Sequence, residues 1–319
     1  MTNQLKAVGV LLCGILCLSC SVVRAEQKFA AFNTSESVFE VTPSDATLSL
    51  ITQSELTSFS LGASTRLGNT LYYVAAPSGS SENALFKVNL KTTALTFVDL
   101  DRSGDDDEVR ALFIRRGKLY GIFYNGNAGS VGLYRITPAT GATTLVLDLS
   151  DLDAEPVPGA IAQVLGVPYM IFKLNSDANR RLLVKFGSTV SSIRSKEILD
   201  SDQNPISCEK IKFNLPRAKF VCLASAESQT QVKVCKVTLA GRASCSSALS
   251  GIERVAGGHT LLTPNQKIYY ALVYAPGEPD NQRLIKFTPA GVVKSNQIVN
   301  TLLIGAHFAN EAPPLLGLP

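Results

Sequence analysis

The densest group of side chains that could do chemistry is an acidic stretch between residues 99 and 108. Side-chain oxygens occur there at the first, third, fifth and ninth positions, on Asp99, Asp101, Ser103 and Asp107. Gly104 occupies the sixth position, and alternating oxygen ligands around such a turn suit a hard cation such as Ca²⁺. The stretch predicts a calcium loop. A solvated acidic turn is the alternative, because Arg110 stands at the twelfth position, where a calcium loop places an acidic residue.

The only two histidines, His259 and His307, form a second candidate site. Imidazole titrates near neutral pH and ligates metals, so two histidines near a common channel could bind a metal or move a proton. The alternative is that each histidine is buried or lines the channel as a hydrogen-bonded side chain. The sequence contains no G-x-S-x-G nucleophile elbow, phosphate-binding glycine loop or H-E-x-x-H pattern.

Four cysteines lie close together in the second half of the chain: Cys208, Cys222, Cys235 and Cys245. An even number of cysteines in an oxidising compartment predicts disulfides. Zinc binding is the competing interpretation, but the spacings contain no C-x-x-C pair, which zinc sites commonly use.

The first 25 residues have the pattern of a secretory signal peptide. Lys6 precedes an uncharged apolar run over residues 7–23, and the segment closes with the small residue Ala25. Three further cysteines, Cys13, Cys17 and Cys20, lie within the segment. The apolar run is near the lower limit for spanning a bilayer, so a membrane anchor is the alternative. We expect a secreted mature domain over residues 26–319, with no membrane contact once the signal is removed.

Charge excludes one broad class of function. Removal of Lys6 and Arg24 with the signal leaves a net charge of +2, and the basic residues are dispersed along the chain. A nucleic-acid binder concentrates its basic residues, so nucleic acid is not an expected partner. Asn33 begins a single glycosylation sequon, Asn33-Thr34-Ser35, which a eukaryotic host could use.

A tetrad of alternating apolar and charged residues recurs six times and organises the whole chain. Its third position is always charged, and its copies begin at Val38, Leu85, Leu133, Leu183, Val234 and Leu284. The intervals of 47 to 51 residues indicate a repeat architecture. Alternation with a period of two predicts a strand, with the charged position on the opposite face from its neighbours.

A second recurring strand precedes five of the tetrads by 13 to 15 residues and is centred on an aromatic residue: Tyr72, Tyr120, Tyr169, Phe220 and Tyr269. Together with a short apolar run before it and a β-run after the tetrad, it makes a unit of four antiparallel strands, A to D. Six such units predict an all-β, six-bladed propeller. Only one strand precedes the first tetrad, so we expect residues 302–308 to supply the missing A strand and close the ring.

The strand assignment gives the cysteines positions but leaves their connectivity open. Cys208 and Cys222 lie symmetrically about the A–B turn of one blade, and Cys235 and Cys245 lie symmetrically about its C–D turn. Cross-strand bridges within each pair are therefore natural. A Cys222–Cys235 bridge is also symmetric, about residue 228, and remains an alternative.

The tyrosine-centred strands, such as Leu71-Tyr72-Tyr73 and Ile268-Tyr269-Tyr270, resemble those of secreted six-bladed propellers of the broad YWTD, NHL and TolB-like type. The Trp-Thr-Asp part of the YWTD motif is absent from every copy, so no binding residue of that family transfers to this chain. The loop beginning at Asp99 is similar to the calcium loops of integrin α-chains. Propeller hydrolases of the gluconolactonase type hold a metal with channel carboxylates, which the expected A strands supply sparsely, with Glu108 and Glu209 at strand entrances.

Two hypotheses of function follow. The first is a secreted, non-catalytic binding or extracellular-matrix protein, monomeric, that holds a protein, glycan or mineral surface and is associated with calcium through the acidic stretch. The alternative is an extracellular hydrolase or lactonase with a metal in the central channel.

Overall fold

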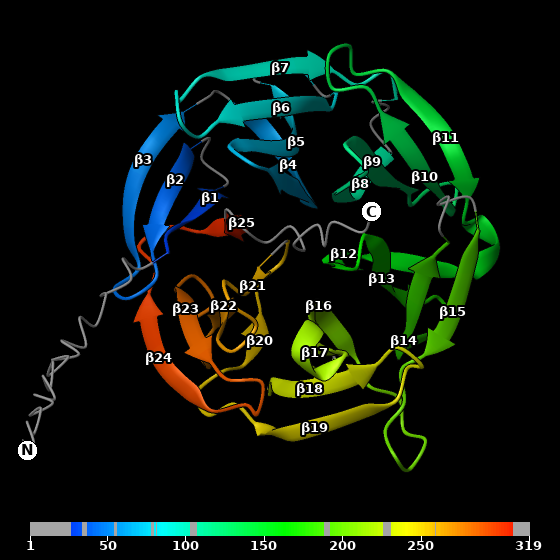
Figure 1. The fold of residues 1–319 in the computed structure, drawn as a ribbon, viewed down its shortest axis with the longest axis vertical. Helices are drawn as coiled ribbons and strands as arrows, with labels where there is room; N and C mark the ends of the chain where they lie inside the picture. The colour runs from blue at the N-terminus through cyan, green and yellow to red at the C-terminus, as the bar shows by residue number, and fades with distance from the viewer. Residues whose placement is uncertain are drawn as a thin grey trace, which may run out of the picture.

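The computed structural model describes residues 27–33, 37–53, 56–77, 80, 82–102, 107–187, 192–225, 231–258 and 260–308, with the backbone alone over residues 56–62. These residues form six antiparallel sheets arranged around a common centre (Figure 1). The expected six-bladed propeller is therefore confirmed. The expected signal peptide lies outside the described residues.

Each blade places its A strand nearest the centre and its D strand on the perimeter (Figure 1). Blade 1 consists of β25 (Leu303–Phe308), β1 (Phe29–Asn33), β2 (Ser37–Thr42) and β3 (Thr47–Gln53). Blade 2 consists of β4 (Leu56–Leu67), β5 (Thr70–Pro77), β6 (Ala84–Asn89) and β7 (Leu95–Asp99). Blade 3 consists of β8 (Asp107–Arg115), β9 (Lys118–Asn125), β10 (Ser130–Ile136) and β11 (Thr143–Asp148).

The second half of the ring repeats this order. Blade 4 consists of β12 (Ala154–Val164), β13 (Val167–Leu174), β14 (Asp177–Phe186) and β15 (Ile193–Glu197). Blade 5 consists of β16 (Cys208–Asn214), β17 (Lys219–Ala224), β18 (Lys233–Thr238) and β19 (Ala243–Ala248). Blade 6 has an interrupted A strand, and consists of β20 (Arg254–Val255), β21 (Leu261–Leu262), β22 (Tyr269–Tyr274), β23 (Gln282–Phe287) and β24 (Val293–Ile298).

The ring closes as the sequence predicts. Strand β25 from the C-terminal side pairs antiparallel with β1, with Phe29 opposite Phe308 and Ala31 opposite Ala306. This pairing supplies main-chain hydrogen bonds to two strand edges that would otherwise be exposed. The first blade is thus built from both ends of the propeller sequence.

The repeating tetrads are the C strands, and their alternation explains the packing. The charged third position is half-buried or exposed in every copy, from Glu40 in β2 to Lys286 in β23. The buried residues on the sheet faces form six apolar clusters among the described residues, each between two neighbouring blades. Burial of these faces is the main source of stability, because each sheet alone would leave both faces in water.

Helix is confined in the described residues to two single 3₁₀ turns, η1 (Ser150–Leu152) and η2 (Leu215–Arg217). Over the same residues, we find no helix with the length and apolarity needed to cross a bilayer.

All A strands run in the same direction, so the ring has two different ends. At one end, which we call the D–A face, the chain passes from the D strand of one blade to the A strand of the next, and from the B strand to the C strand within each blade. At the other end, A strands turn into B strands, and we call the five turns of blades 2 to 6 the A–B rim. The rim comprises residues 66–70, 115–118, 164–167, 214–219 and 263–268.

Candidate functional site

The acidic stretch that predicts a calcium loop lies at the D–A face, and its carboxylates face different partners. Asp101 accepts hydrogen bonds from the backbone N–H of Thr143 (2.9 Å) and from its hydroxyl (2.7 Å). Asp107 accepts one from the Asn125 amide (3.1 Å) and pairs with the Arg102 guanidinium (3.0 Å). The exposed Asp99 ends β7.

The calcium interpretation therefore stays a prediction. Ser103, one of its four predicted ligands, lies outside the described residues. Within the part of the chain that is described, no three His, Cys, Asp or Glu side chains gather as metal ligands would.

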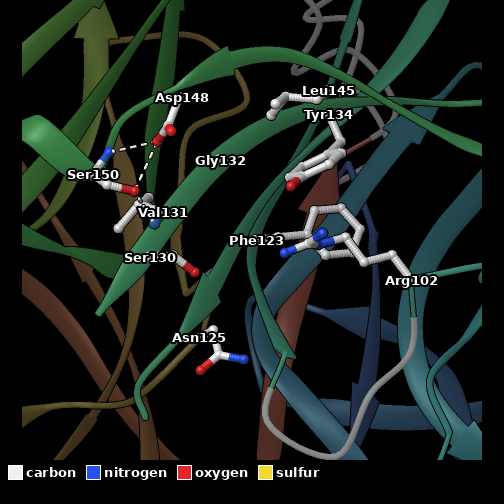
Figure 2. Close-up of a pocket in the computed structure, with 10 residues that line it drawn as sticks. All are labelled: Arg102, Phe123, Asn125, Ser130, Val131, Gly132, Tyr134, Leu145, Asp148 and Ser150. Atoms are coloured by element: carbon white, nitrogen blue, oxygen red, sulfur yellow. Dashed lines mark hydrogen bonds between the residues drawn. The ribbon is translucent and has the colours of Figure 1, made fainter. Parts of the chain in front are cut away.

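A small cavity of about 70 Å³ lies beside this stretch, between Arg102 and blade 3 (Figure 2). The Arg102 guanidinium sits 4.7 Å from the centre of the Tyr134 ring, a cation–π contact. On the far side, the Asp148 carboxylate accepts hydrogen bonds from the backbone N–H (3.0 Å) and hydroxyl (2.7 Å) of Ser150 (Figure 2). The cavity is about large enough for a few water molecules, so it is too small for an organic ligand.

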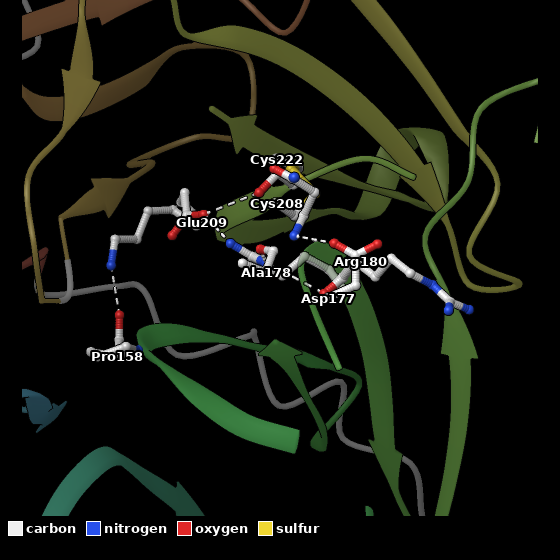
Figure 3. Close-up of polar contacts among 11 residues, drawn as sticks. Pro158, Asp177, Ala178, Arg180, Cys208, Glu209 and Cys222 are labelled. Atoms are coloured by element: carbon white, nitrogen blue, oxygen red, sulfur yellow. Dashed lines mark hydrogen bonds and ion pairs between the residues drawn. A yellow bond between two sulfur atoms is a disulfide. The ribbon is translucent and has the colours of Figure 1, made fainter. Parts of the chain in front are cut away.

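A buried polar cluster joins blades 4 and 5 near the same face (Figure 3). Arg181, only 2% exposed, pairs with Glu209 (2.6 Å) and donates to the Ala178 carbonyl. The Lys210 ammonium donates to the Pro158 carbonyl at 2.6 Å. Burial lowers the pKa of Lys210 to about 8, against a smaller opposing effect of Glu209. These contacts join blades 4 and 5, and burial of the Lys210 ammonium carries a desolvation cost.

Only one of the two candidate histidines can be placed. His307 is 3% exposed on β25, and its Nε2 lies 2.8 Å from the Ser64 hydroxyl on β4. This contact joins the inner strands of blades 1 and 2. His259 lies outside the described residues, so a two-histidine site stays a prediction.

Side-chain hydrogen bonds between neighbouring blades recur around the centre. Gln163 of blade 4 donates to the Ile114 carbonyl of blade 3 (2.8 Å). Gln282 of blade 6 both donates to and accepts from the backbone of Leu303 in blade 1 (2.7 and 2.9 Å). These polar side chains of the inner and neighbouring strands therefore hold the ring together.

Asn33, the sequon asparagine, is 4% exposed at the end of β1. Its amide donates to the Thr301 hydroxyl (3.0 Å), and its carbonyl accepts from the Ser37 N–H (2.9 Å). Thr34 and Ser35 lie outside the described residues. Glycosylation at Asn33 stays a prediction, and a glycan on this amide would replace a contact that joins blade 1 to the closing segment.

Two disulfides staple blade 5, as expected for an oxidising compartment. Cys208 is bonded to Cys222 across β16 and β17, and Cys235 to Cys245 across β18 and β19. Cys222 and Cys235 also face each other in the register of β17 and β18, yet they are not bonded to one another. Each disulfide therefore joins the two strands of one hairpin, and the alternative Cys222–Cys235 bridge is not formed.

The opposite end of the ring carries charges of a different kind. The A–B rim contains no Asp or Glu in any of its five turns. Five exposed cations occur in or beside these turns and take part in no ion pair with the described residues: Arg116, Lys118, Arg217, Lys219 and Lys267. The turns of blades 3, 5 and 6 therefore present exposed positive charge at this end of the ring, without ion-pair partners among the described residues.

Hydrogen bonds hold the rim turns rigidly. Arg115 of blade 3 donates to the Gly187 carbonyl in the C–D turn of blade 4 (2.8 Å). In blade 5, Asn214 donates to the Gln266 carbonyl (2.7 Å) and to the buried Tyr269 hydroxyl (2.9 Å) of blade 6. Burial, and then the neighbouring charge of Arg116, lower the pKa of Arg115. These hydrogen bonds thus fix turns that carry cations to their neighbouring blades.

The rim was missed by sequence reasoning. Its cations come from turns about 50 residues apart, so they read as dispersed charge along the chain. The signal that could have revealed it is positional: the turn between the A and B strands carries Arg or Lys in four of five repeats, all but blade 4, and Asp or Glu in none. That comparison needs the repeats aligned by blade position.

No protein-family model matches this chain, and no curated protein sequence matches it. Solved structures do share its fold. A chain from the crystal structure of a nidogen/laminin complex superposes with a TM-score of 0.59 at 9% identity, covering 90% of this chain and 99% of that one.

Two further structures superpose less closely. A mutant of AofleA from Arthrobotrys oligospora has a TM-score of 0.51 at 12% identity, covering 89% of this chain and 90% of that one. An exo-beta-1,3-galactanase from Phanerochaete chrysosporium has a TM-score of 0.51 at 13% identity, covering 77% of this chain and 63% of that one. At such low identities the similarity establishes the β-propeller fold alone.

Proposed function

We propose that this protein is an extracellular, non-catalytic binding propeller that holds an anionic partner on the A–B rim. The observation that carries the proposal is the set of five exposed cations without ion-pair partners among the described residues, in or beside turns that contain no acidic residue. Like charges held together destabilise the folded protein, and an anionic partner would relieve that repulsion. Electrostatic complementarity of this kind speeds association and selects partners by charge.

Three observations support an extracellular binding role. The first 25 residues have the pattern of a secretory signal, and two disulfides staple blade 5. One similar propeller was solved in a nidogen/laminin complex, so this fold is able to present a surface to a protein. A calcium-associated matrix role is a finer form of the same proposal, and it depends on the stretch that begins at Asp99. A calcium-induced rise in melting temperature that is lost in Asp101→Ala would support it.

An extracellular hydrolase or lactonase with a channel metal is the second candidate. The carboxylates that such a metal site would use, at the entrances of the A strands, form ion pairs: Glu108 with Arg110 (2.7 Å) and Glu209 with Arg181 (2.6 Å). Metal analysis of the purified protein separates the two candidates. A stoichiometric, tightly held divalent ion would favour the hydrolase and count against the binding propeller.

The binding proposal is tested with immobilised heparin and poly-glutamate as two unrelated polyanions. The rim variant carries Arg116→Ser, Lys118→Ser, Arg217→Ser and Lys219→Ser. The control variant loses the same number of arginines and lysines from exposed positions on C and D strands, namely Arg135, Arg194, Lys196 and Lys294, each changed to Ser. Both variants have the same net charge, so only the placement of charge differs.

We expect wild type and the control variant to be retained on both polyanions, and the rim variant to elute at much lower salt. Salt should weaken retention of all three proteins, because exposed charges are screened within about 8 Å at physiological ionic strength. Equal elution of the two variants would show that net charge alone is responsible and would overturn the proposal.

A further inference from the structure

The A–B rim also exposes large apolar side chains, one in each of three blades. Leu67 in blade 2 is 43% exposed, Leu165 in blade 4 is 61% exposed, and Leu215 in blade 5 is 38% exposed. Each lies in or beside an A–B turn, at the same end of the ring as the rim cations. The rim is therefore both cationic and apolar, a combination that solvation alone does not favour.

Leu165 occupies a backbone conformation that suits a leucine poorly. The two-residue turn between β12 and β13 consists of Leu165 and Gly166, with φ of 49° and 76°, so both residues are left-handed. Such hairpin turns favour Asn-Gly, because a Cβ-branched or bulky side chain is strained there. A strained and exposed leucine at the tip of a turn is more easily explained by a contact outside the chain than by the fold.

The geometry of the rim indicates the shape of its partner. The A strands run in the same direction around the ring, so the three leucine-bearing turns all lie at one end of it. A protein partner would need a separate socket for each projecting leucine. A bilayer surface is flat and deformable, accepts apolar tips into its interfacial layer, and presents phosphates and carboxylates to flanking cations.

We infer that the A–B rim docks on a membrane surface rich in anionic phospholipid, with Leu67, Leu165 and Leu215 entering the interfacial layer. This inference rests on the proposed binding role of the rim and names its partner. The sequence predicts no membrane contact for the mature chain, because the docking residues come from separate turns and produce no apolar run. Docking of this kind is reversible and weakens with salt.

The test is flotation of the secreted chain with phosphatidylcholine vesicles, prepared with and without phosphatidylserine. We expect binding only to the vesicles that contain phosphatidylserine. Changing the three rim leucines to Ser should lower the partition coefficient by at least roughly tenfold, since each inserted leucine contributes apolar burial.

A matched control removes three exposed apolar residues from D strands, Leu50, Leu145 and Ile298, which are 52 to 59% exposed, each changed to Ser. This control should bind the phosphatidylserine vesicles as wild type does. Thermal unfolding of both triple variants checks that the fold is retained.

The outcomes distinguish membrane docking from the proposed binding of an anionic partner, on which it rests. Retention on heparin and poly-glutamate without binding to the phosphatidylserine vesicles overturns membrane docking and preserves an anionic partner in solution. Failure on all three overturns both. Equal binding by the two leucine variants also overturns the inference, because docking would then not depend on the rim tips.

Discussion

The two ends of the propeller are built from the same strands but treat charge in opposite ways. At the D–A face, cations lie against carboxylates: Arg110 pairs with Glu108 and Glu155, Arg102 with Asp107, and Arg181 with Glu209. At the A–B rim, cations such as Arg116 and Lys219 are exposed and have no ion-pair partner among the described residues. The D–A face thus contains several ion pairs, whereas the rim cations have none among the described residues.

This difference separates structural from functional charge. A buried and paired charge cannot be removed without leaving its partner unsatisfied, so it belongs to the stability of the ring. An exposed and unpaired charge contributes little to stability and is available for binding. The comparison predicts that substitutions at the D–A face change stability, whereas substitutions at the rim change binding.

The largest expected effect is at the D–A face. Arg181→Met should lower the free energy of unfolding by about 3 kcal/mol, because it leaves the partly buried Glu209 and the Ala178 carbonyl without their partner. Arg116→Met on the rim should change it by less than about 0.5 kcal/mol, as for other exposed sites. Urea denaturation measures both values, and similar losses for the two variants would contradict the division between the faces.

The buried Lys210 makes the free energy of unfolding depend on pH, which the exposed rim cations should not do. Below pH 8 it is protonated in both folded and unfolded states, and the folded state bears the full cost of the buried charge. Between about pH 8 and 10, the folded state has lost this proton while the unfolded state retains it. The free energy of unfolding should therefore rise with pH by roughly 2 to 3 kcal/mol from this group.

Burial also raises the pKa of Tyr269 to about 12, which opposes the Lys210 effect only above pH 10. Urea denaturation at a series of pH values up to 10 isolates the Lys210 contribution. Lys210→Met should remove the rise, and its persistence in that variant would assign the rise to another group.

The smallest expected effect is at the rim and has the opposite sign. Leu165→Asn should raise the free energy of unfolding by about 0.5 to 1 kcal/mol, because Asn tolerates the left-handed conformation better than Leu. The same change should weaken vesicle binding. Leu239→Asn, at an exposed turn residue without a positive φ, is the control and should bring no such gain. A loss of stability in Leu165→Asn would show that Leu165 serves the fold.

Much of the fold was predictable because it is encoded locally and repeatedly. The tetrads beginning at Val38 and Leu284 alternate with a period of two, which fixes the C strands, and the aromatic strands around Tyr72 and Tyr269 set the blade length. The single strand before the first tetrad predicted that residues 302–308 close the ring, and β25 confirms it.

The candidate site was less predictable, because it depends on contacts between distant segments. Sequence alone could not choose between the disulfide connectivities, since Cys222 has symmetric partners on both sides. It also could not show that Asp101 faces Thr143 or that His307 faces Ser64, because each partner lies on a neighbouring blade.

By itself, the sequence determined a ring of six four-stranded blades, because side-chain alternation and turn spacing act over a few residues and repeat with a constant period. Only the tertiary structure decided which charges meet. Closing the ring brings turns about 50 residues apart to the same end, so dispersed residues such as Arg116, Leu165 and Arg217 lie on one side of the molecule. Charge and apolarity act through space, and their sum at the rim exists only once the blades are assembled.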